Sequence, residues 1–233
     1  MSTLRLAIVG DGKMGKAIAS LAPEHGFEVV ALLGEREVLP TGINKTLLAG
    51  ADVAVEFTTP QYAATNVRAC VAAGCPVICG TTGWDSARSA VENEVRAKGG
   101  ALLWAPNFSI GVHLFSRIVE YAARLMKEAN ADFDAHMIET HHNQKVDAPS
   151  GTARSLAERV ANAIGSAMPI TSVRLGSVPG THTVMFDGAF EQIKLEHIAR
   201  DRRVFATGAL TAAKWIVGKT GVFTFDHMLG TGV

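Results

Sequence analysis

The chain has 233 residues, enough for one large or two small domains, and its 22 basic residues balance its 22 acidic residues. A balanced charge gives no general attraction to nucleic acid or to an anionic membrane, so we expect small-molecule partners. No apolar run approaches the ~20 residues that span a bilayer, and the apolar run at residues 4–9 is too short for a signal peptide. We therefore expect a cytoplasmic protein whose cysteines, Cys70, Cys75 and Cys79, are buried thiols.

The first half of the chain alternates apolar strand patterns with helical patterns. Strands are expected at residues 4–9, 29–33, 52–57, 77–79 and 101–104, and helices at residues 13–21, 61–73 and 86–98. Alternation of this kind, with strands rich in Val and Ile, is typical of a parallel sheet covered on both faces. We predict an α/β fold whose N-terminal domain is a Rossmann-type doubly wound parallel sheet.

A glycine-rich loop follows the first expected strand and has the pattern G-x-G-x-x-G. Its glycines permit a tight turn and the close approach of a pyrophosphate to backbone N–H groups. Glu35 stands 20 residues after Gly15, where an acidic residue can accept hydrogen bonds from a ribose diol, whereas Arg36 and Lys13 can hold a 2′-phosphate. The pattern thus predicts a site for NADH, NADPH or both, and a nucleotide-free α/β domain is the alternative. The candidate cofactor-binding residues here are Gly10, Asp11, Gly12, Lys13, Met14, Gly15, Glu35 and Arg36.

The pattern changes near residue 106. A long helix is expected at residues 110–129, followed by a strand at 133–140, a helix at 152–164, strands at 172–175, 182–186 and 193–198, a helix at 204–219 and a closing segment at 220–230. Hairpin-like strands of this kind favour a mixed or antiparallel sheet, and so a C-terminal α+β domain with a mixed sheet. We expect residues 1–106, completed by 213–233, to bind the dinucleotide, and residues 107–212 to bind substrate and form the oligomer.

Residues 139–152 read Glu-Thr-His-His-Asn-Gln-Lys-Val-Asp-Ala-Pro-Ser-Gly-Thr. Ser150, Gly151 and Thr152 open a helical pattern, and the free N–H groups at such a helix start bind carboxylates and phosphates. Lys145 adds a positive charge nearby. The segment therefore reads as an anion receptor, in which Glu139 and Asp147 are expected to orient their neighbours. A polar surface loop is the alternative.

The pattern E-x-H-H-x-x-K-x-D-A-P-S-G-T is met at every fixed position and resembles the active-site motif of the dihydrodipicolinate reductase family of lysine and diaminopimelate biosynthesis. The resemblance implies hydride transfer from NADH or NADPH to a cyclic imine dicarboxylate, the dihydrodipicolinate derived from 4-hydroxy-tetrahydrodipicolinate, giving tetrahydrodipicolinate. It also implies that His141 donates a proton and that Lys145 stabilises negative charge. His142 would contact the substrate, Ser150, Gly151 and Thr152 would grip a carboxylate, and no metal is required.

Two further loops match the same family, which is typically a homotetramer built through its C-terminal sheet. The G-T-T-G at residues 80–83 and the A-P-N-F-S at 105–109 correspond to loops that line the nicotinamide. The resemblance adds Gly80, Thr81, Thr82, Ala105, Pro106, Asn107 and Phe108 to the cofactor-binding residues. A turn of small residues and a domain hinge that touches no ligand are the alternatives for these two loops.

Two other functions compete with a reductase. A metal-dependent hydrolase would use ligands from His136, Glu139, His141 and His142, but their spacing lacks the helical H-E-x-x-H geometry. A catalytically silent dinucleotide sensor would bind reduced nicotinamide without oxidising it. One assay of nicotinamide oxidation in the presence of substrate separates the sensor from the reductase.

Overall fold

A computed structural model describes residues 3–38, 42–130 and 132–230, except for the side chains of Arg36 and Val38. The chain divides into two compact units, residues 1–108 with 203–233, and residues 109–202. Within the described part of the chain, no helix is long and apolar enough to cross a membrane.

The first unit contains a six-stranded sheet in the order β10-β5-β4-β3-β1-β2, and every neighbouring pair is parallel. Its strands are β1 (Leu4–Val9), β2 (Phe27–Leu33), β3 (Val53–Glu56), β4 (Val77–Cys79), β5 (Ala101–Trp104) and β10 (Gly221–Phe223). From β1 the chain moves outward to β2 and then crosses back to β3 on the other side of β1. The strand order therefore reverses between β1 and β3, which is where open α/β sheets bind ligands outside the carboxyl ends of their strands.

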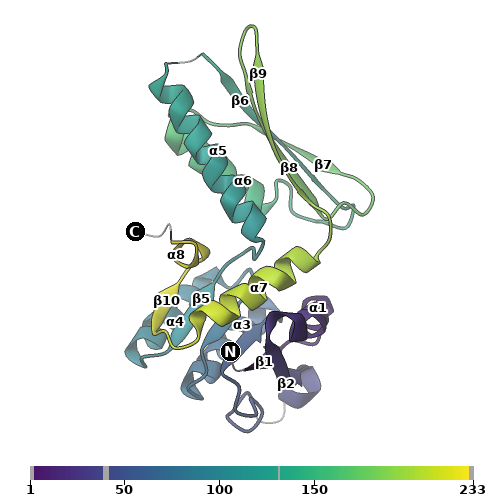
Figure 1. The fold of residues 1–233 in the computed structure, drawn as a ribbon, viewed down its shortest axis with the longest axis vertical. Helices are drawn as coiled ribbons and strands as arrows, with labels where there is room; N and C mark the ends of the chain where they lie inside the picture. Colours follow the sequence, from purple (N-terminus) through teal and green to yellow (C-terminus); the bar gives the residue numbers. More distant parts are fainter. Residues whose placement is uncertain (1–2, 39–41, 131, 231–233) are drawn as a thin grey trace. The chain divides into compact units, whose positions relative to one another are not determined.

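Helices cover both faces of this sheet (Figure 1). They are α1 (Lys13–Leu21), α3 (Pro60–Ala72), α4 (Asp85–Ala97) and α7 (Arg203–Ile216), with the short helices η1 (Pro23–His25), α2 (Glu35–Val38) and α8 (Phe225–Met228). Ala7 and Val9 of β1 belong to the core beneath α3 and α4, while Leu6 and Ile8 are fully buried on the opposite face. Burial on both faces explains the continuous apolar strands and confirms the doubly wound sheet.

Helix α7 returns the chain to the first unit at Arg203, and not at residue 213 as expected from the sequence. Its buried side, which includes Ala206, Ala209, Leu210 and Ala213, packs against β3, β4 and β5. Because one continuous apolar stripe runs along the helix, the whole helix belongs to the sheet that this stripe covers.

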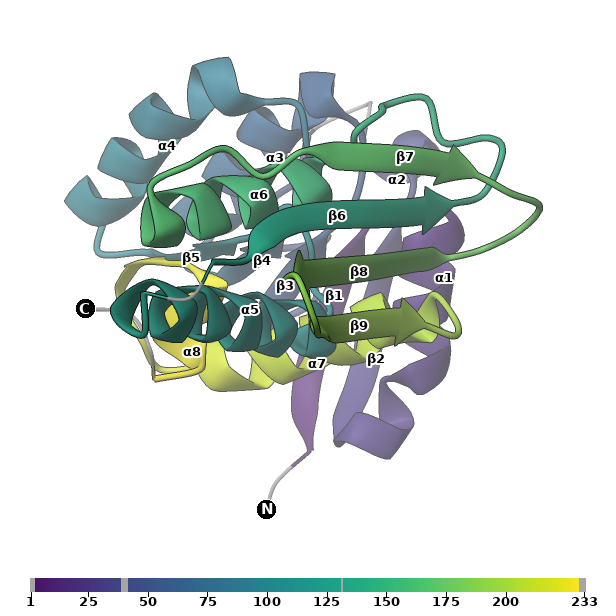
Figure 2. The same cartoon turned by 90° about the horizontal axis from the view of Figure 1, so that it is seen from above.

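The second unit is a mixed four-stranded sheet in the order β7-β6-β8-β9 (Figure 2). Its strands are β6 (Asp134–His141), β7 (Ile170–Arg174), β8 (Gly180–Asp187) and β9 (Gln192–Ala199), and only the β6–β7 pair is parallel. Helices α5 (Ile110–Glu128) and α6 (Gly151–Ile164) pack side by side on one face (Figure 1). Met137, Val184 and Phe186 are buried beneath them. Alternation along the strands therefore sends every second side chain of β6 and β8 toward the helices.

Candidate functional site

The glycine loop after β1 is shaped by two close approaches of backbone to backbone. A Cβ atom on Gly10, whose φ is +110°, would lie 2.1 Å from the carbonyl oxygen of Phe57. A Cβ atom on Gly15 would lie 1.8 Å from the carbonyl oxygen of Gly10. Gly12 is different, because a Cβ atom there meets nothing within 4 Å. The first and third glycines are thus required by the fold, while the second leaves open space next to the start of α1.

A cavity of about 370 Å³ opens beside this loop at the carboxyl ends of β1, β2 and β3. We call it the β1–β3 crevice. Its lining residues are Val9, Gly10, Asp11, Gly12, Leu33, Gly34, Glu35, Phe57, Thr58, Thr59, Gln61, Tyr62 and Asn66. The structure brings Gly10, Asp11 and Gly12 together with Glu35, as the dinucleotide motif requires, while the neighbouring Lys13 does not line the cavity. The sequence did not identify residues 59–66 as part of this site. Their position after the carboxyl end of a parallel strand, where ligands bind in such sheets, was a usable signal.

The end of the crevice near Glu35 is rich in carboxylates. The backbone N–H of Gly34 donates a hydrogen bond of 2.8 Å to Glu37 Oε2. A Cβ atom on Gly34 would lie 2.8 Å from Asp11 Oδ2 and 3.0 Å from Glu37 Oε2. Asp11 and Glu37 therefore both approach the backbone next to Glu35. Arg36 is the one cofactor candidate whose side chain falls outside the described atoms.

The G-T-T-G loop after β4 is tied to the crevice wall by Thr81. Its hydroxyl accepts a hydrogen bond of 2.9 Å from the backbone N–H of Thr58, and its carbonyl accepts from the indoles of Trp84 at 2.8 Å and Trp104 at 3.1 Å. Gly80 packs so closely that a Cβ atom there would lie 2.1 Å from the Phe57 ring. Of the two threonines in the loop, Thr81 is therefore held by the fold, whereas Thr82 is exposed.

The loop after β5 begins with the buried Ala105, whose N–H donates to the carbonyl of Cys79 at 3.3 Å. Phe108 is also buried, and its ring packs against Phe57 and Phe225 with centroids 5.6 Å and 5.4 Å apart. Pro106 is exposed and Asn107 half-buried. The two ends of this loop are therefore anchored in the core, and its middle is accessible.

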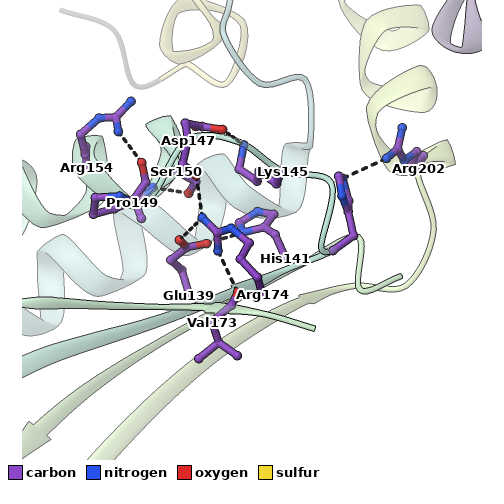
Figure 3. A network of polar contacts seen from close by, with 12 residues as sticks. Glu139, His141, Lys145, Asp147, Pro149, Ser150, Arg154, Val173, Arg174 and Arg202 are labelled. Atoms are coloured by element: carbon purple, nitrogen blue, oxygen red, sulfur yellow. Dashed lines mark hydrogen bonds and ion pairs between the residues drawn. The ribbon is translucent and has the colours of Figure 1, made fainter. Parts of the chain in front are cut away.

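In the second unit, Glu139 and His141 project from β6 on the face that the helices cover. Glu139 is fully buried, and one of its oxygens, Oε1, accepts a hydrogen bond of 2.8 Å from Nη2 of Arg174. Its other oxygen, Oε2, is hydrogen-bonded to Nδ1 of His141 (Figure 3). One buried carboxylate thus joins the candidate proton donor to an arginine of the neighbouring strand.

The surroundings shift the pKa values of both groups downward. Burial opposes ionisation of Glu139, but hydrogen bonds from Arg174 and His141 outweigh it and lower the pKa of the carboxyl group. Burial also lowers the pKa of His141, and Glu139 opposes that shift. Glu139 is therefore an anion near neutral pH, and it makes the protonated form of His141 easier to reach than burial alone would allow.

The loop after β6 places a cation beside a helix start. Lys145 Nζ donates a hydrogen bond of 2.7 Å to Asp147 Oδ1, and Arg174 Nη2 donates to the Asp147 carbonyl at 2.6 Å (Figure 3). Ser150 caps helix α6 by accepting a hydrogen bond of 3.1 Å from the N–H of Ala153. Gly151 and Thr152 form the first turn of α6. The structure therefore holds Lys145 and the helix start on one loop, as an anion receptor needs.

His142 is separated from His141 by the end of β6, which stops at His141. Strand alternation therefore does not apply between the two histidines. The Nε2 atom of His142 lies 3.1 Å from Nη2 of Arg202, the last residue of the second unit. Arg202 was not singled out from the sequence, because sixty residues separate it from His142.

Two more histidines extend the row that begins at His141. The strand register sets His182 opposite Glu139 and His197 opposite His182. The His182 ring lies 5.2 Å from that of His141 and 6.5 Å from that of His197. Burial, with a smaller contribution from His141, lowers the pKa of His182 to about 4, so its ring is neutral. The sequence motifs assigned no role to either histidine, although alternation along β8 and β9 was a usable signal once the strands were paired.

The ligand set of the metal-hydrolase alternative does not converge. His136 lies on the opposite face of β6 from Glu139 and His141, and its Nε2 atom lies 2.9 Å from the hydroxyl of Thr171. Among the residues that the structure describes, no group of three or more His, Cys, Asp or Glu side chains is arranged to hold a metal ion.

Comparisons with known proteins match the two units separately and the chain as a whole. Residues 4–108 match the family model described as dihydrodipicolinate reductase, N-terminus, and residues 111–229 match dihydrodipicolinate reductase, C-terminus. Curated relatives named 4-hydroxy-tetrahydrodipicolinate reductase include those of Methanosarcina mazei, 37% identical over 94% of this chain and 86% of the relative, and Christiangramia forsetii, 32% identical over 97% and 98%.

Solved structures agree with these relatives. A dipicolinate-bound dihydrodipicolinate reductase from Paenisporosarcina sp. TG-14 is 26% identical, with a TM-score of 0.77 over 96% of this chain and 98% of that one. An engineered D-amino acid dehydrogenase bound to NADP⁺ is 13% identical, with a TM-score of 0.56 over 96% of this chain and 93% of that one, and shares the fold alone.

Proposed function

This chain belongs to the dihydrodipicolinate reductase family, and on that premise we propose that it reduces the dihydrodipicolinate derived from 4-hydroxy-tetrahydrodipicolinate to tetrahydrodipicolinate. The observation that carries this proposal is the complete motif of residues 139–152, which contains the Glu139–His141 pair, the Lys145–Asp147 pair and the start of α6. Dipicolinate, the dicarboxylate bound in the Paenisporosarcina relative, has the two carboxylates that such an anion receptor suits.

The residues of the second unit would divide the work as follows. His141 donates a proton to the enamine that is left once hydride has added to the conjugated substrate. Lys145 and the start of helix α6 at residues 150–152 bind a substrate carboxylate, and Lys145 also stabilises developing negative charge. His142 contacts the substrate, with its ring position set by Arg202.

The first unit would bind the dinucleotide, and NADH or NADPH supplies the hydride when bound. The pyrophosphate fits the open space beside Gly12, and Glu35 accepts hydrogen bonds from the ribose diol in the β1–β3 crevice. Asp11 and Glu37 add negative charge next to Glu35 and so disfavour a 2′-phosphate. We therefore propose that NADH binds more tightly than NADPH. Thr81, Thr82 and residues 105–108 would line the nicotinamide side.

Two other features support a proposal for assembly and location. The face of the β7-β6-β8-β9 sheet opposite α5 and α6 carries the exposed apolar residues Val173 and Ile198. We propose that copies bury this face in the homotetramer that the family resemblance implies. Cys70, Cys75 and Cys79 are free and buried, which suits the reducing cytoplasm.

The test is an assay of reduced nicotinamide oxidation, started with freshly made 4-hydroxy-tetrahydrodipicolinate. We expect NADH absorbance to fall only when this substrate is present, and dipicolinate to inhibit the reaction. Calorimetry of NADH binding serves as the control, because a dinucleotide sensor would bind NADH but leave it unoxidised with every batch of substrate.

A further inference from the structure

Both carboxylate oxygens of Glu139 form hydrogen bonds, one with His141 and the other with Arg174. Oε2 is engaged by Nδ1 of His141, and Oε1 accepts from Arg174. An ionised carboxylate only accepts hydrogen bonds, so the imidazole must carry a proton on Nδ1 to complete this contact. The hydrogen bond therefore selects one tautomer of neutral His141. When the ring is protonated on both nitrogens, the Nδ1 proton is hydrogen-bonded to this carboxylate, so the Nε2 proton is the one available for transfer.

The groups that face His141 come from every strand around it. Glu139 lies on β6, Arg174 on β7 and the neutral His182 on β8, and Lys145 follows in the loop. Of these four, Glu139 supplies the negative charge, while Arg174 and Lys145 supply positive charge that disfavours a protonated imidazole. Glu139 and Arg174 thus act on His141 in opposite directions.

The space beside Nε2 is left open by a glycine. A Cβ atom on Gly180 would lie 3.1 Å from His141 Nε2, which is tighter than ordinary van der Waals contact. A side chain at position 180 would therefore crowd Nε2, whereas Nδ1 is held by the hydrogen bond to Glu139. A ring flip, which would place Cδ2 where Nδ1 now lies, would break the contact with the buried carboxylate.

We propose that Glu139 is a positioning residue that orients His141 and keeps its Nε2–H as the transferable proton, and that Arg174 holds Glu139 in place and limits its effect. This role rests on the proposed reductase function. In the step concerned, the Nε2–H bond breaks, its electron pair stays on the imidazole, and the proton joins the carbon of the enamine. Glu139 stays ionised throughout, and its hydrogen bond at Nδ1 stabilises the imidazolium form before transfer.

Two substitutions with opposite expected signs test the proposal. Glu139→Gln removes the anion, so the pKa of His141 should fall by about one pH unit. Arg174→Met removes a cation next to Glu139, so the pKa of His141 should rise. Both values are measured by ¹⁵N NMR titration of the histidine rings in the whole protein. The same spectra report the tautomer, and we expect Nδ1–H in the wild type and a mixture in Glu139→Gln.

Activity provides the second readout. A proton donor must be protonated, so kcat should decline as pH rises through the pKa of His141. This descending limb should move to lower pH in Glu139→Gln and to higher pH in Arg174→Met. Glu120→Gln is the matched control, because it removes a carboxylate that pairs with Arg159 at 3.2 Å in the same unit and should leave the limb unmoved.

A role in folding alone would lower stability in both variants without moving the His141 titration in opposite directions. Shifts of the same sign, or no shift, would overturn the proposal. If Glu139→Gln does not fold, Arg174→Met decides by itself, since an unchanged or lowered pKa of His141 contradicts it. A wild-type protein without reductase activity would overturn the proposed function, and the tautomer measurement would still be readable.

Discussion

At the scale of single residues, His141 and Lys145 belong to one motif but contact different groups. His141 is buried against Glu139, whereas Lys145 forms an ion pair with Asp147 in the loop. Losing a proton donor and losing an anion-binding cation should therefore affect different kinetic constants.

We expect His141→Gln to lower kcat by roughly 10²–10⁴-fold with little change in KM, because glutamine cannot donate a proton near neutral pH. Lys145→Ala should lower kcat and also raise KM for the dicarboxylate, because it removes a charge that binds the ground state. Steady-state kinetics check both, and NADH affinity is the control. If His142→Gln abolished turnover while His141→Gln did not, the donor would be His142.

The proposed role of Glu35 in cofactor preference also belongs to the scale of single residues. It lines the β1–β3 crevice beside Asp11, where the ribose diol is expected. Glu35→Ala should weaken NADH binding more than NADPH binding, because the lost hydrogen bonds are made to the diol. Calorimetry with both cofactors checks this. Equal losses for the two would remove Glu35 from that role.

At the scale of elements, the turn from β1 into α1 separates what the fold needs from what the ligand needs. Gly15→Ala places a Cβ atom 1.8 Å from a carbonyl oxygen, so it should destabilise the protein by about 1–3 kcal/mol or more. Gly12→Ala meets nothing within 4 Å and should fold normally, yet weaken dinucleotide binding by occupying the space for the pyrophosphate. Thermal unfolding and calorimetry measure the two effects. Equal unfolding temperatures for Gly15→Ala and the wild type would contradict this account.

The boundaries of elements show where sequence patterns were sufficient. The expected strands at residues 77–79 and 101–104 coincide with β4 and β5, because short runs buried on both faces end sharply at Gly80 and Ala105. The sequence pattern at residues 220–230 predicts only a closing segment, with no named helix or strand, yet this segment contains β10 and α8. A three-residue strand has no period of its own, and it forms here because β5 offers a free edge for pairing.

At the scale of the whole molecule, the sheet of the second unit predicts how copies assemble. Ile198 is 55% exposed on the face opposite α5 and α6, next to Thr181 of β8. We expect the wild type to be a tetramer at micromolar concentration and Ile198→Glu to dissociate it, because a charge would be buried in the interface. Light scattering checks the mass. Leu175→Glu is the control, as an exposed leucine beyond the end of β7, and a monomeric wild type would contradict the prediction.

The sequence by itself was sufficient to identify the family, the α/β class and the two motifs, because each of these depends on residues that are close together along the chain. The G-x-G-x-x-G loop and the motif at residues 139–152 need only local order to be read, and the family models confirm the resemblance. The tertiary structure alone placed Arg174 against Glu139, His182 beside His141, and α7 on the first unit. These contacts depend on which strands pair and in what register, and strand pairing is decided by burial of the whole sheet rather than by any local run of residues.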